Sequence, residues 1–221
     1  NPRASRTVPL VSKVCNIRMV PLATDIITSE LTGRPSPVSS LKEQNIPYFG
    51  VKEAVFPFNM FPEVDPLLGP EMRSTGEVLG LSTYYGEAFY KAQTKLPLKG
   101  TVLISVNRKD KPEVVEVAKL FAEAGFKILA TGKTHEIITD AGVEAEKVLK
   151  LYEGRPNVLD LITNGDIDLI INSPVGKDSV HDDSYLRKAA IKAKIPYMTT
   201  IAAAKASIKG ILYVQKHGNG E

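Results

Sequence analysis

Residues 101–131 read TVLISVNRKDKPEVVEVAKLFAEAGFKILAT, and this stretch decides the fold. Its first part, residues 101–107, is apolar and rich in β-branched side chains, which predicts a buried strand. The middle is amphipathic, with Pro112 near its start and Gly125 at its end, as is typical of a helix. The last part, residues 126–131, predicts a second buried strand. The stretch therefore predicts a strand, a helix and a parallel strand.

The same alternation continues through the rest of the chain. Helices are predicted at 134–142, 157–165, 183–194 and 201–210, and strands at 145–150, 168–174 and 195–200. Strand and helix alternate about five times, which favours a parallel sheet with helices on both faces. Residues 101–221 are therefore predicted to form an α/β domain, a Rossmann-like doubly wound parallel sheet.

Residues 1–93 follow a different pattern. Residues 20–33 predict a helix with apolar side chains on one face, residues 51–58 predict a strand, and residues 83–93 predict another helix. Residues 65–80, rich in Pro and Gly, show almost no periodicity. This half does not resemble a self-sufficient core, so we interpret it as the α+β tail of a larger domain.

Residues 94–100, TKLPLKG, are predicted to be the linker between the two halves, because Pro97 and Gly100 interrupt regular structure.

The composition excludes several classes of protein. The chain has 221 residues, a net charge of +3, and no long run of Lys and Arg that would indicate a nucleic-acid-binding arm. Its one cysteine, Cys15, excludes an internal disulfide and a zinc site of several cysteines. No apolar run approaches the length of a membrane span. The composition therefore predicts a cytoplasmic protein that binds neither nucleic acid nor membrane.

Several predicted strands are followed by residues suited to an anion. Ligands of such sheets bind beyond the carboxyl ends of the strands, where helix N-termini present unpaired N–H groups. Hydroxyl, ammonium and amide side chains there predict a pocket for a phosphorylated small molecule. The residues are Lys111, Thr131, Gly132, Thr134, Lys150 and Asn172.

Simpler readings of the same residues remain open. A Thr at a helix start is most often an N-cap, and lysines near helix ends are usually solvated. The GKT within ATGKTHE is not a phosphate-binding P-loop, because position 127, where that motif needs Gly, is Lys.

The sequence resembles the carboxyl-terminal end of the carbamoyl-phosphate synthetase large-subunit family over nearly its whole length. Residues 101–221 are similar to the methylglyoxal-synthase-like regulatory domain of that subunit. Residues 1–93 are similar to the tail of its second ATP-grasp unit. The segments that carry the resemblance are NPRASRT, VKEAVFPF, DPLLGPEMRSTGEV, ATGKT, EGRP and INSPVGK.

The resemblance implies a partial catalytic site at the start of the sequence. Asn1 matches a ligand of the divalent metal, Mg²⁺ or Mn²⁺, that bridges ATP phosphates, and Arg3 and Arg6 match arginines that hold phosphate. The family's metal-binding Glu precedes the matching Asn by two residues. Since Mg²⁺ needs several oxygen ligands, we expect this chain alone to bind no such cofactor and to make no carbamoyl phosphate.

The resemblance also implies a regulatory role. The family's effector residues match five residues of the anion pocket, and its effectors are nucleoside monophosphates, UMP or IMP. The five are Lys111, Thr131, Thr134, Lys150 and Asn172. Pro174 stands where the best-known bacterial pattern has Thr. The full enzyme works with a glutamine-hydrolysing small subunit and often forms oligomers.

A second effector of some family members is ornithine. Glu53 and Thr199 match residues of the ornithine site, whereas Met198 replaces an Asp that would pair with the ligand's ammonium group. Glu53 is equally explained as a solvated charge on a strand.

Two other functions are compatible with parts of the sequence. A free-standing methylglyoxal synthase shares the fold but needs a carboxylate base, and this chain has Arg155 and Pro156 where that acid is expected. A pure assembly module would use the aromatic residues Tyr84, Tyr85, Phe89 and Tyr90, which more often belong to a core.

Overall fold

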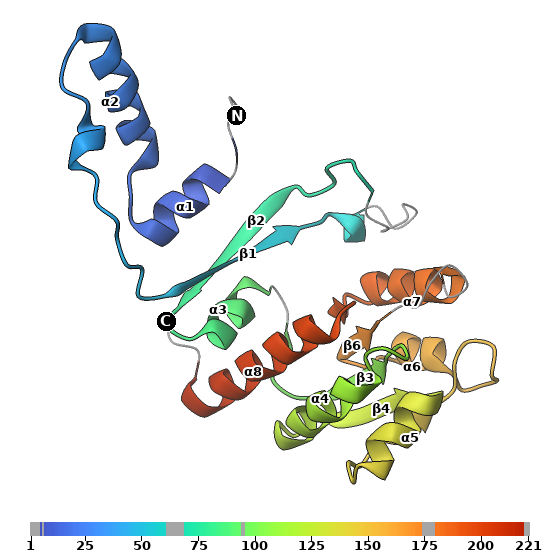
Figure 1. The fold of residues 1–221 in the computed structure, drawn as a ribbon. Helices are drawn as coiled ribbons and strands as arrows, with labels where there is room; N and C mark the ends of the chain where they lie inside the picture. Colours follow the sequence, from blue (N-terminus) through green and yellow to red (C-terminus); the bar gives the residue numbers. More distant parts are fainter. Residues whose placement is uncertain (1–4, 6, 61–68, 94–95, 174–179, 219–221) are drawn as a thin grey trace.

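The computed structural model describes residues 5, 7–60, 69–93, 96–173 and 180–218 (Figure 1). Its main feature is a five-stranded parallel sheet with the strand order β5-β4-β3-β6-β7. The strands are β3 (Thr101–Ser105), β4 (Lys127–Thr131), β5 (Glu146–Val148), β6 (Leu169–Asn172) and β7 (Tyr197–Met198). The predicted doubly wound α/β fold is confirmed.

Helices cover both faces of this sheet. One face carries α4 (Lys111–Glu123), α5 (Gly132–Asp140) and α8 (Ile201–His217), and the other carries α6 (Val158–Asn164) and α7 (Val180–Lys192). Successive side chains of a strand point to opposite faces, so Val102 and Ile104 face α4 and α8, whereas Leu103 faces α6 and α7.

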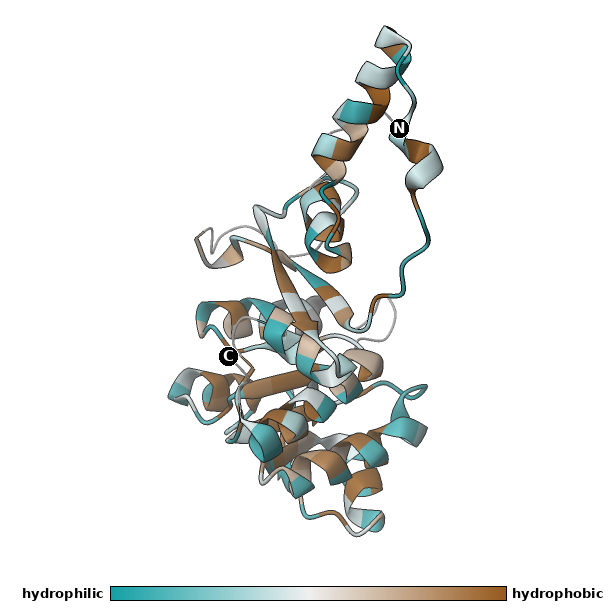
Figure 2. Ribbon diagram, turned by 90° about the vertical axis from the view of Figure 1, so that its left-hand side faces the viewer, coloured by the Kyte–Doolittle hydropathy of each residue, from teal (hydrophilic) through white to brown (hydrophobic). Residues whose placement is uncertain are grey.

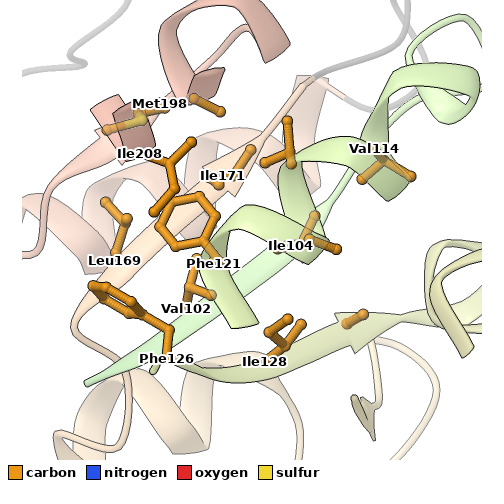
Figure 3. Packing of buried hydrophobic residues seen from close by; sticks show 14 of the residues in the cluster. Val102, Ile104, Val114, Phe121, Phe126, Ile128, Leu169, Ile171, Met198 and Ile208 are labelled. Atoms are coloured by element: carbon orange, nitrogen blue, oxygen red, sulfur yellow. The ribbon is translucent and has the colours of Figure 1, made fainter. Parts of the chain in front are cut away.

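The larger core lies between the sheet and α4, α5 and α8. Figure 3 shows Phe121 of α4 among Val102, Leu169 and Ile208, and Phe121 is fully buried. Its ring meets Phe126 edge to face, with 5.2 Å between the ring centres. This core holds in place the strands whose carboxyl ends carry polar residues.

The strand order reverses beside β3. From β3 the chain goes through β4 to the edge strand β5, and then returns to place β6 on the other side of β3. Such a reversal opens a crevice at the carboxyl ends of the two central strands, where ligands of these folds bind. Ser105 of β3 and Asn172 of β6 are register partners at this position.

The first half of the chain consists of helices and an antiparallel ribbon. Its elements are α1 (Thr7–Cys15), α2 (Met19–Thr32), η1 (Pro37–Ser40), β1 (Phe49–Val55), η2 (Phe58–Met60), β2 (Gly76–Ser82) and α3 (Tyr85–Ala92). The predicted strand at 51–58 is confirmed in its first part. Residues 65–80 show almost no periodicity, yet β2 begins within them at Gly76 and pairs with β1.

Helix α2 projects away from both sheets (Figure 1). The predicted ends are confirmed, since Gly33 adopts the left-handed conformation that closes the helix. Its apolar residues, however, remain largely exposed, with Ile27 57% and Leu31 80% accessible. Figure 2 shows brown, hydrophobic bands on the projecting helices.

The two halves meet where α3 crosses α8. Gly86 of α3 and Gly210 of α8 lie at the crossing, and a Cβ added to Gly86 would lie 3.0 Å from the backbone nitrogen of Gly210. The ring of Tyr84 stacks on that of Tyr213, with 4.6 Å between their centres. Of the aromatic residues weighed as an assembly surface, Tyr84 therefore contributes to this internal junction.

Within the described residues, no helix has the length and apolar character needed to cross a membrane.

Candidate functional site

Four polar residues form a row across the carboxyl ends of neighbouring strands. The Thr131 hydroxyl donates to Ser105 Oγ at 2.7 Å, and Asn172 Nδ2 donates to the Tyr197 hydroxyl at 2.6 Å. Ser105 and Asn172 are register partners between these two pairs. We call Thr131, Ser105, Asn172 and Tyr197 the polar row. It runs across the strand-order reversal, on the face covered by α6 and α7.

The loop after β3 is held against this row. The backbone N–H of Asn107 donates to Ser173 Oγ at 3.0 Å, and Ser173 N–H donates to the Ser105 carbonyl at 3.1 Å. Asn107 Nδ2 also donates to Asp110 Oδ2 at 2.9 Å. These bonds fix the path of the chain between β3 and the start of α4.

Thr134 is buried beside the same loop. Its hydroxyl accepts from the Val106 N–H at 3.3 Å, and only 3% of the residue is exposed. Thr131 is also 3% exposed. Both predicted threonines therefore lie at the crevice, with their hydroxyls hydrogen-bonded to the end of β3 or the residue after it.

Two helices begin at this edge without a side-chain cap. Thr131 occupies the N-cap position of α5, and Asp110 that of α4, yet neither side chain accepts from its helix. By contrast, Asn157 and Thr200 do cap α6 and α8. The alternative interpretation of Thr131 as an ordinary N-cap is therefore wrong. The N–H groups at the start of α5 stay available to an anion.

Gly132, the first residue of α5, leaves space at this helix end. Its φ of +43° lies in the region that favours glycine, and an added Cβ would meet no heavy atom within 4 Å. A ligand can therefore approach this backbone closely.

The two predicted lysines lie on the flanks of the crevice. Lys111 is the half-buried first residue of α4, and Lys150 is exposed two residues beyond β5. Strands β5 and β6 are three strand spacings apart, which corresponds to about 14 Å. The structure thus places all six predicted residues at one edge of the sheet, and hydrogen bonds link Thr131 and Thr134 to the β3 end.

A cavity of about 470 Å³ opens next to Lys150. It is lined by Leu151, Tyr152, Gly154, Arg155, Asn157, Leu159 and Tyr185. Tyr152 is 76% exposed and Tyr185 is 56% exposed. Aromatic faces at the border of a polar crevice are suited to a planar ring.

The chain is similar in sequence to several known proteins. Residues 113–199 match the model of the MGS-like domain. A carbamoyl phosphate synthase large chain, C-terminal section, from Aquifex aeolicus (strain VF5) is 43% identical over 100% of this chain and 45% of its own length. The corresponding section from Methanopyrus kandleri is 47% identical over 99% of this chain and 42% of its own length.

The chain is homologous to the carboxyl-terminal part of carbamoyl phosphate synthase large chains.

The chain spans less than half the length of these large-chain sections. It covers only 20% of the carbamoyl phosphate synthase large chain from Acidobacterium capsulatum, to which it is 46% identical. A solved methylglyoxal synthase from Elizabethkingia anophelis NUHP1 is 21% identical over 51% of this chain and 79% of its own, with a TM-score of 0.43.

The residues matched to ornithine in this family do not line a cavity themselves, but each adjoins a residue that lines a second cavity, of about 370 Å³. Glu53 Oε2 accepts from Gln93 Nε2 at 3.1 Å, and Gln93 lines the cavity. Thr199 is exposed and directly follows Met198, another lining residue. Glu53 is thus a half-buried, hydrogen-bonded group on β1.

The predicted catalytic and metal residues of the large-chain family, Asn1, Arg3 and Arg6, lie outside the described residues, as does Pro174. Within the described part, no group of three or more His, Cys, Asp or Glu side chains is placed to hold a metal ion.

Sequence reasoning missed Ser105, Asn107, Ser173 and Tyr197. Ser105 and Asn107 lie near the end of the predicted strand at 101–107. Because the carboxyl ends of parallel strands meet at one edge of the sheet, both could have been predicted to lie beside Thr131 and Asn172. Tyr197 gave no such signal, because its role depends on which strand lies beside β7.

Proposed function

We propose that this chain is the regulatory carboxyl-terminal portion of a glutamine-dependent carbamoyl phosphate synthase large chain and binds a nucleoside monophosphate, UMP or IMP. The observation that carries this proposal is the uncapped start of α5 beside the two buried threonines, Thr131 and Thr134, at the strand-order reversal. Homology to the large chains along the whole sequence supports it.

The phosphate of the effector would occupy the start of α5. The N–H groups there carry partial positive charge, and Gly132 lets phosphate oxygens approach them. The Thr131 hydroxyl, now donating to Ser105, can rotate to donate to a phosphate oxygen instead. Lys111 and Lys150 would supply ammonium charge from the two flanks.

The nucleoside would extend from the phosphate toward the 470 Å³ cavity beside Lys150. Its size is within the range of small-molecule sites. Tyr152 and Tyr185 offer ring faces for a base, and Arg155 offers hydrogen-bond donors. Asn172, at the other end of the crevice, contributes an amide to the phosphate-side contacts.

The activity of the complete enzyme is part of the same proposal. The full protein would make carbamoyl phosphate from glutamine or ammonia, bicarbonate and two ATP, for pyrimidine and arginine synthesis in the cytoplasm. It would work with a glutamine amidotransferase small subunit and with Mg²⁺ or Mn²⁺. Because the chain spans only 45% and 42% of the two large-chain sections, we propose that it makes no carbamoyl phosphate alone.

Methylglyoxal synthesis is not proposed, because the nearby carboxylate is already engaged. Asp160 Oδ2 accepts from the Asn157 N–H at 2.9 Å and completes the capping box of α6. A base held in this way stabilises a helix end and does not face a substrate in the crevice.

Calorimetric titration tests the proposal. We expect one nucleotide per chain to bind when UMP or IMP is added, and uridine, which lacks the phosphate, to bind far more weakly. Titration with ornithine tests the second cavity separately. Absence of binding by both nucleotides at millimolar concentration would refute the effector site, and turnover of dihydroxyacetone phosphate would favour the methylglyoxal synthase alternative.

A further inference from the structure

Both polar atoms of the Asn107 side chain are hydrogen-bonded. Its Oδ1 accepts from the backbone N–H groups of Lys109 at 2.7 Å and of Asp110 at 3.2 Å. Its Nδ2 donates to Asp110 Oδ2 at 2.9 Å and to Ser173 Oγ at 3.2 Å. The residue is half-buried and lies between β3 and α4, so its side chain fixes the turn that leads into α4.

One of these bonds determines where the Asp110 carboxylate lies. Asp110 occupies the N-cap position of α4, where an Asp side chain ordinarily accepts from the first N–H groups of the helix. Here it makes no such bond, and its Oδ2 accepts from Asn107 instead. The partial positive charge at the start of α4 is therefore not compensated by the carboxylate of its own N-cap residue.

The position of this carboxylate matters because Lys111 follows it directly. Lys111 is the first residue of α4 and belongs to the proposed phosphate site. No ion pair joins Asp110 to Lys111 in the described part of the chain. A carboxylate released from Asn107 would approach the Lys111 ammonium, and there it would compete with a phosphate for that charge and repel it.

Ser173 holds Asn107 from the other central strand. Its hydroxyl accepts from the Asn107 N–H at 3.0 Å as well as from Nδ2, and only 5% of Ser173 is exposed. Ser173 directly follows β6, so the turn is tied to both strands at whose ends the crevice opens. An amide bonded on both sides in this way has little freedom to release Asp110.

We propose that Asn107 is a positioning residue for effector binding, which acts by holding the Asp110 carboxylate away from Lys111. The inference rests on the proposed function for its ligand, whereas the bond between Asn107 and Asp110 is present without one. In this role Asn107 does not touch the nucleotide. It keeps a negative charge out of a site that receives a phosphate.

Nucleotide titration of three variants tests the inference. Asn107→Ser keeps a hydroxyl that can accept within the turn but removes the amide that holds Asp110. We expect this change to weaken UMP or IMP binding about ten-fold, because the freed carboxylate opposes the phosphate. Asp110→Ala should bind at least as tightly as the wild type, and the double variant should bind like Asp110→Ala.

The recovery in the double variant separates positioning from a merely structural role. If Asn107→Ser acted by distorting the turn, removal of the Asp110 side chain would not restore the affinity. A double variant as weak as Asn107→Ser would overturn the inference, and so would unchanged affinity in Asn107→Ser. Asn164→Ser, an exposed change at the end of α6, is the matched control. Should Asn107→Ser fail to fold, Asn107→Thr makes the same comparison.

A second arm needs no nucleotide. Acylation of lysine amines is followed by mass spectrometry, with exposed Lys119 of α4 as the internal reference. Only the uncharged amine reacts, and a nearby carboxylate favours the charged form. Lys111 should therefore react about three-fold more slowly in Asn107→Ser and recover in the double variant.

The two arms fail separately. If neither nucleotide binds the wild-type chain, the proposed effector function fails. The acylation rates still decide whether Asn107 keeps Asp110 away from Lys111, and an unchanged Lys111 rate in Asn107→Ser would overturn that hold.

Discussion

Gly86 of α3 and Gly210 of α8 approach so closely that neither position has room for a side chain. A Cβ on Gly86 would lie 3.0 Å from the Gly210 nitrogen, and a Cβ on Gly210 would overlap the Gly86 carbonyl oxygen. Real Cβ atoms avoid such distances to backbone atoms, which have no rotamer by which to move away. This contact sets how the first half is seated on the sheet domain.

Gly210→Ala should destabilise the protein by about 1–3 kcal/mol, because the added methyl group overpacks the crossing. In an ordinary helix interior, replacing Gly by Ala would instead raise the free energy of unfolding by about 1 kcal/mol. Urea denaturation measures the difference. Gly69→Ala is the control, since its Cβ would meet nothing within 4 Å. A stabilised Gly210→Ala variant would mean that the helices do not cross at this residue.

Glu87 should make stability depend on pH. The Ser82 hydroxyl donates to its carboxylate, and this bond, followed by the influence of Lys91 at 2.9 Å, outweighs burial and lowers the pKa of Glu87. A lowered folded-state pKa gives stabilisation that is present above the unfolded value of 4.5 and is lost as pH falls through the folded value.

Glu87→Gln should therefore cost about 1–2 kcal/mol at neutral pH, as expected for a lost hydrogen bond to a charged group. The difference from wild type should shrink steadily as pH falls below 4.5. Denaturation curves between neutral and acidic pH measure it, with exposed Glu144→Gln as the control. A cost that is the same at every pH would show that the Glu87 charge does not contribute.

Thr131→Val should weaken UMP or IMP binding by about 1–3 kcal/mol, because valine keeps the shape of threonine and removes the hydroxyl donor. Thr163→Val is the matched control. Its hydroxyl donates to the Leu159 carbonyl within α6, away from the crevice. Calorimetry compares the two variants, and equal affinities would remove Thr131 from the phosphate site.

Lys111→Ala should lower nucleotide affinity and also make it less sensitive to salt. An ammonium group at the half-buried start of α4 attracts phosphate at short range, and dissolved ions screen that attraction. Lys119→Ala, an exposed change on the same helix, should alter neither quantity. Titrations at two ionic strengths test this, and an unchanged salt dependence in Lys111→Ala would contradict the assignment.

Most helices and strands of the second half could be predicted from the sequence. The apolar periodicity indicates where each element lies, and Gly and Pro residues indicate the same ends. Gly125, Gly142 and Gly165 follow their helices as expected, each with a positive φ. Strand β2 was missed because Pro and Gly fill the residues before it, and its pairing with β1 is a tertiary contact. The periodicity of a short segment does not reveal a strand when most of the strand's stability comes from the neighbouring strand with which it pairs.

The candidate site was predicted only as far as each residue could be placed along the chain. Thr131 and Asn172 are the last residues of their strands, so their edge was predictable. Their neighbours were not, since the lateral order of strands decides that Ser105 lies between them and that Tyr197 reaches Asn172. The strand order depends on the whole fold.

Helix α8 packs through Ile208 on the large sheet and through Gly210 on α3. In protein synthesis its residues emerge after every strand described in the structure. Until then, neither the sheet face that carries α4 and α5 nor the inner side of α3 can be fully covered. During translation, both halves therefore keep apolar surface exposed until α8 has been synthesised. In that interval the nascent chain is most accessible to chaperones and most prone to misassembly.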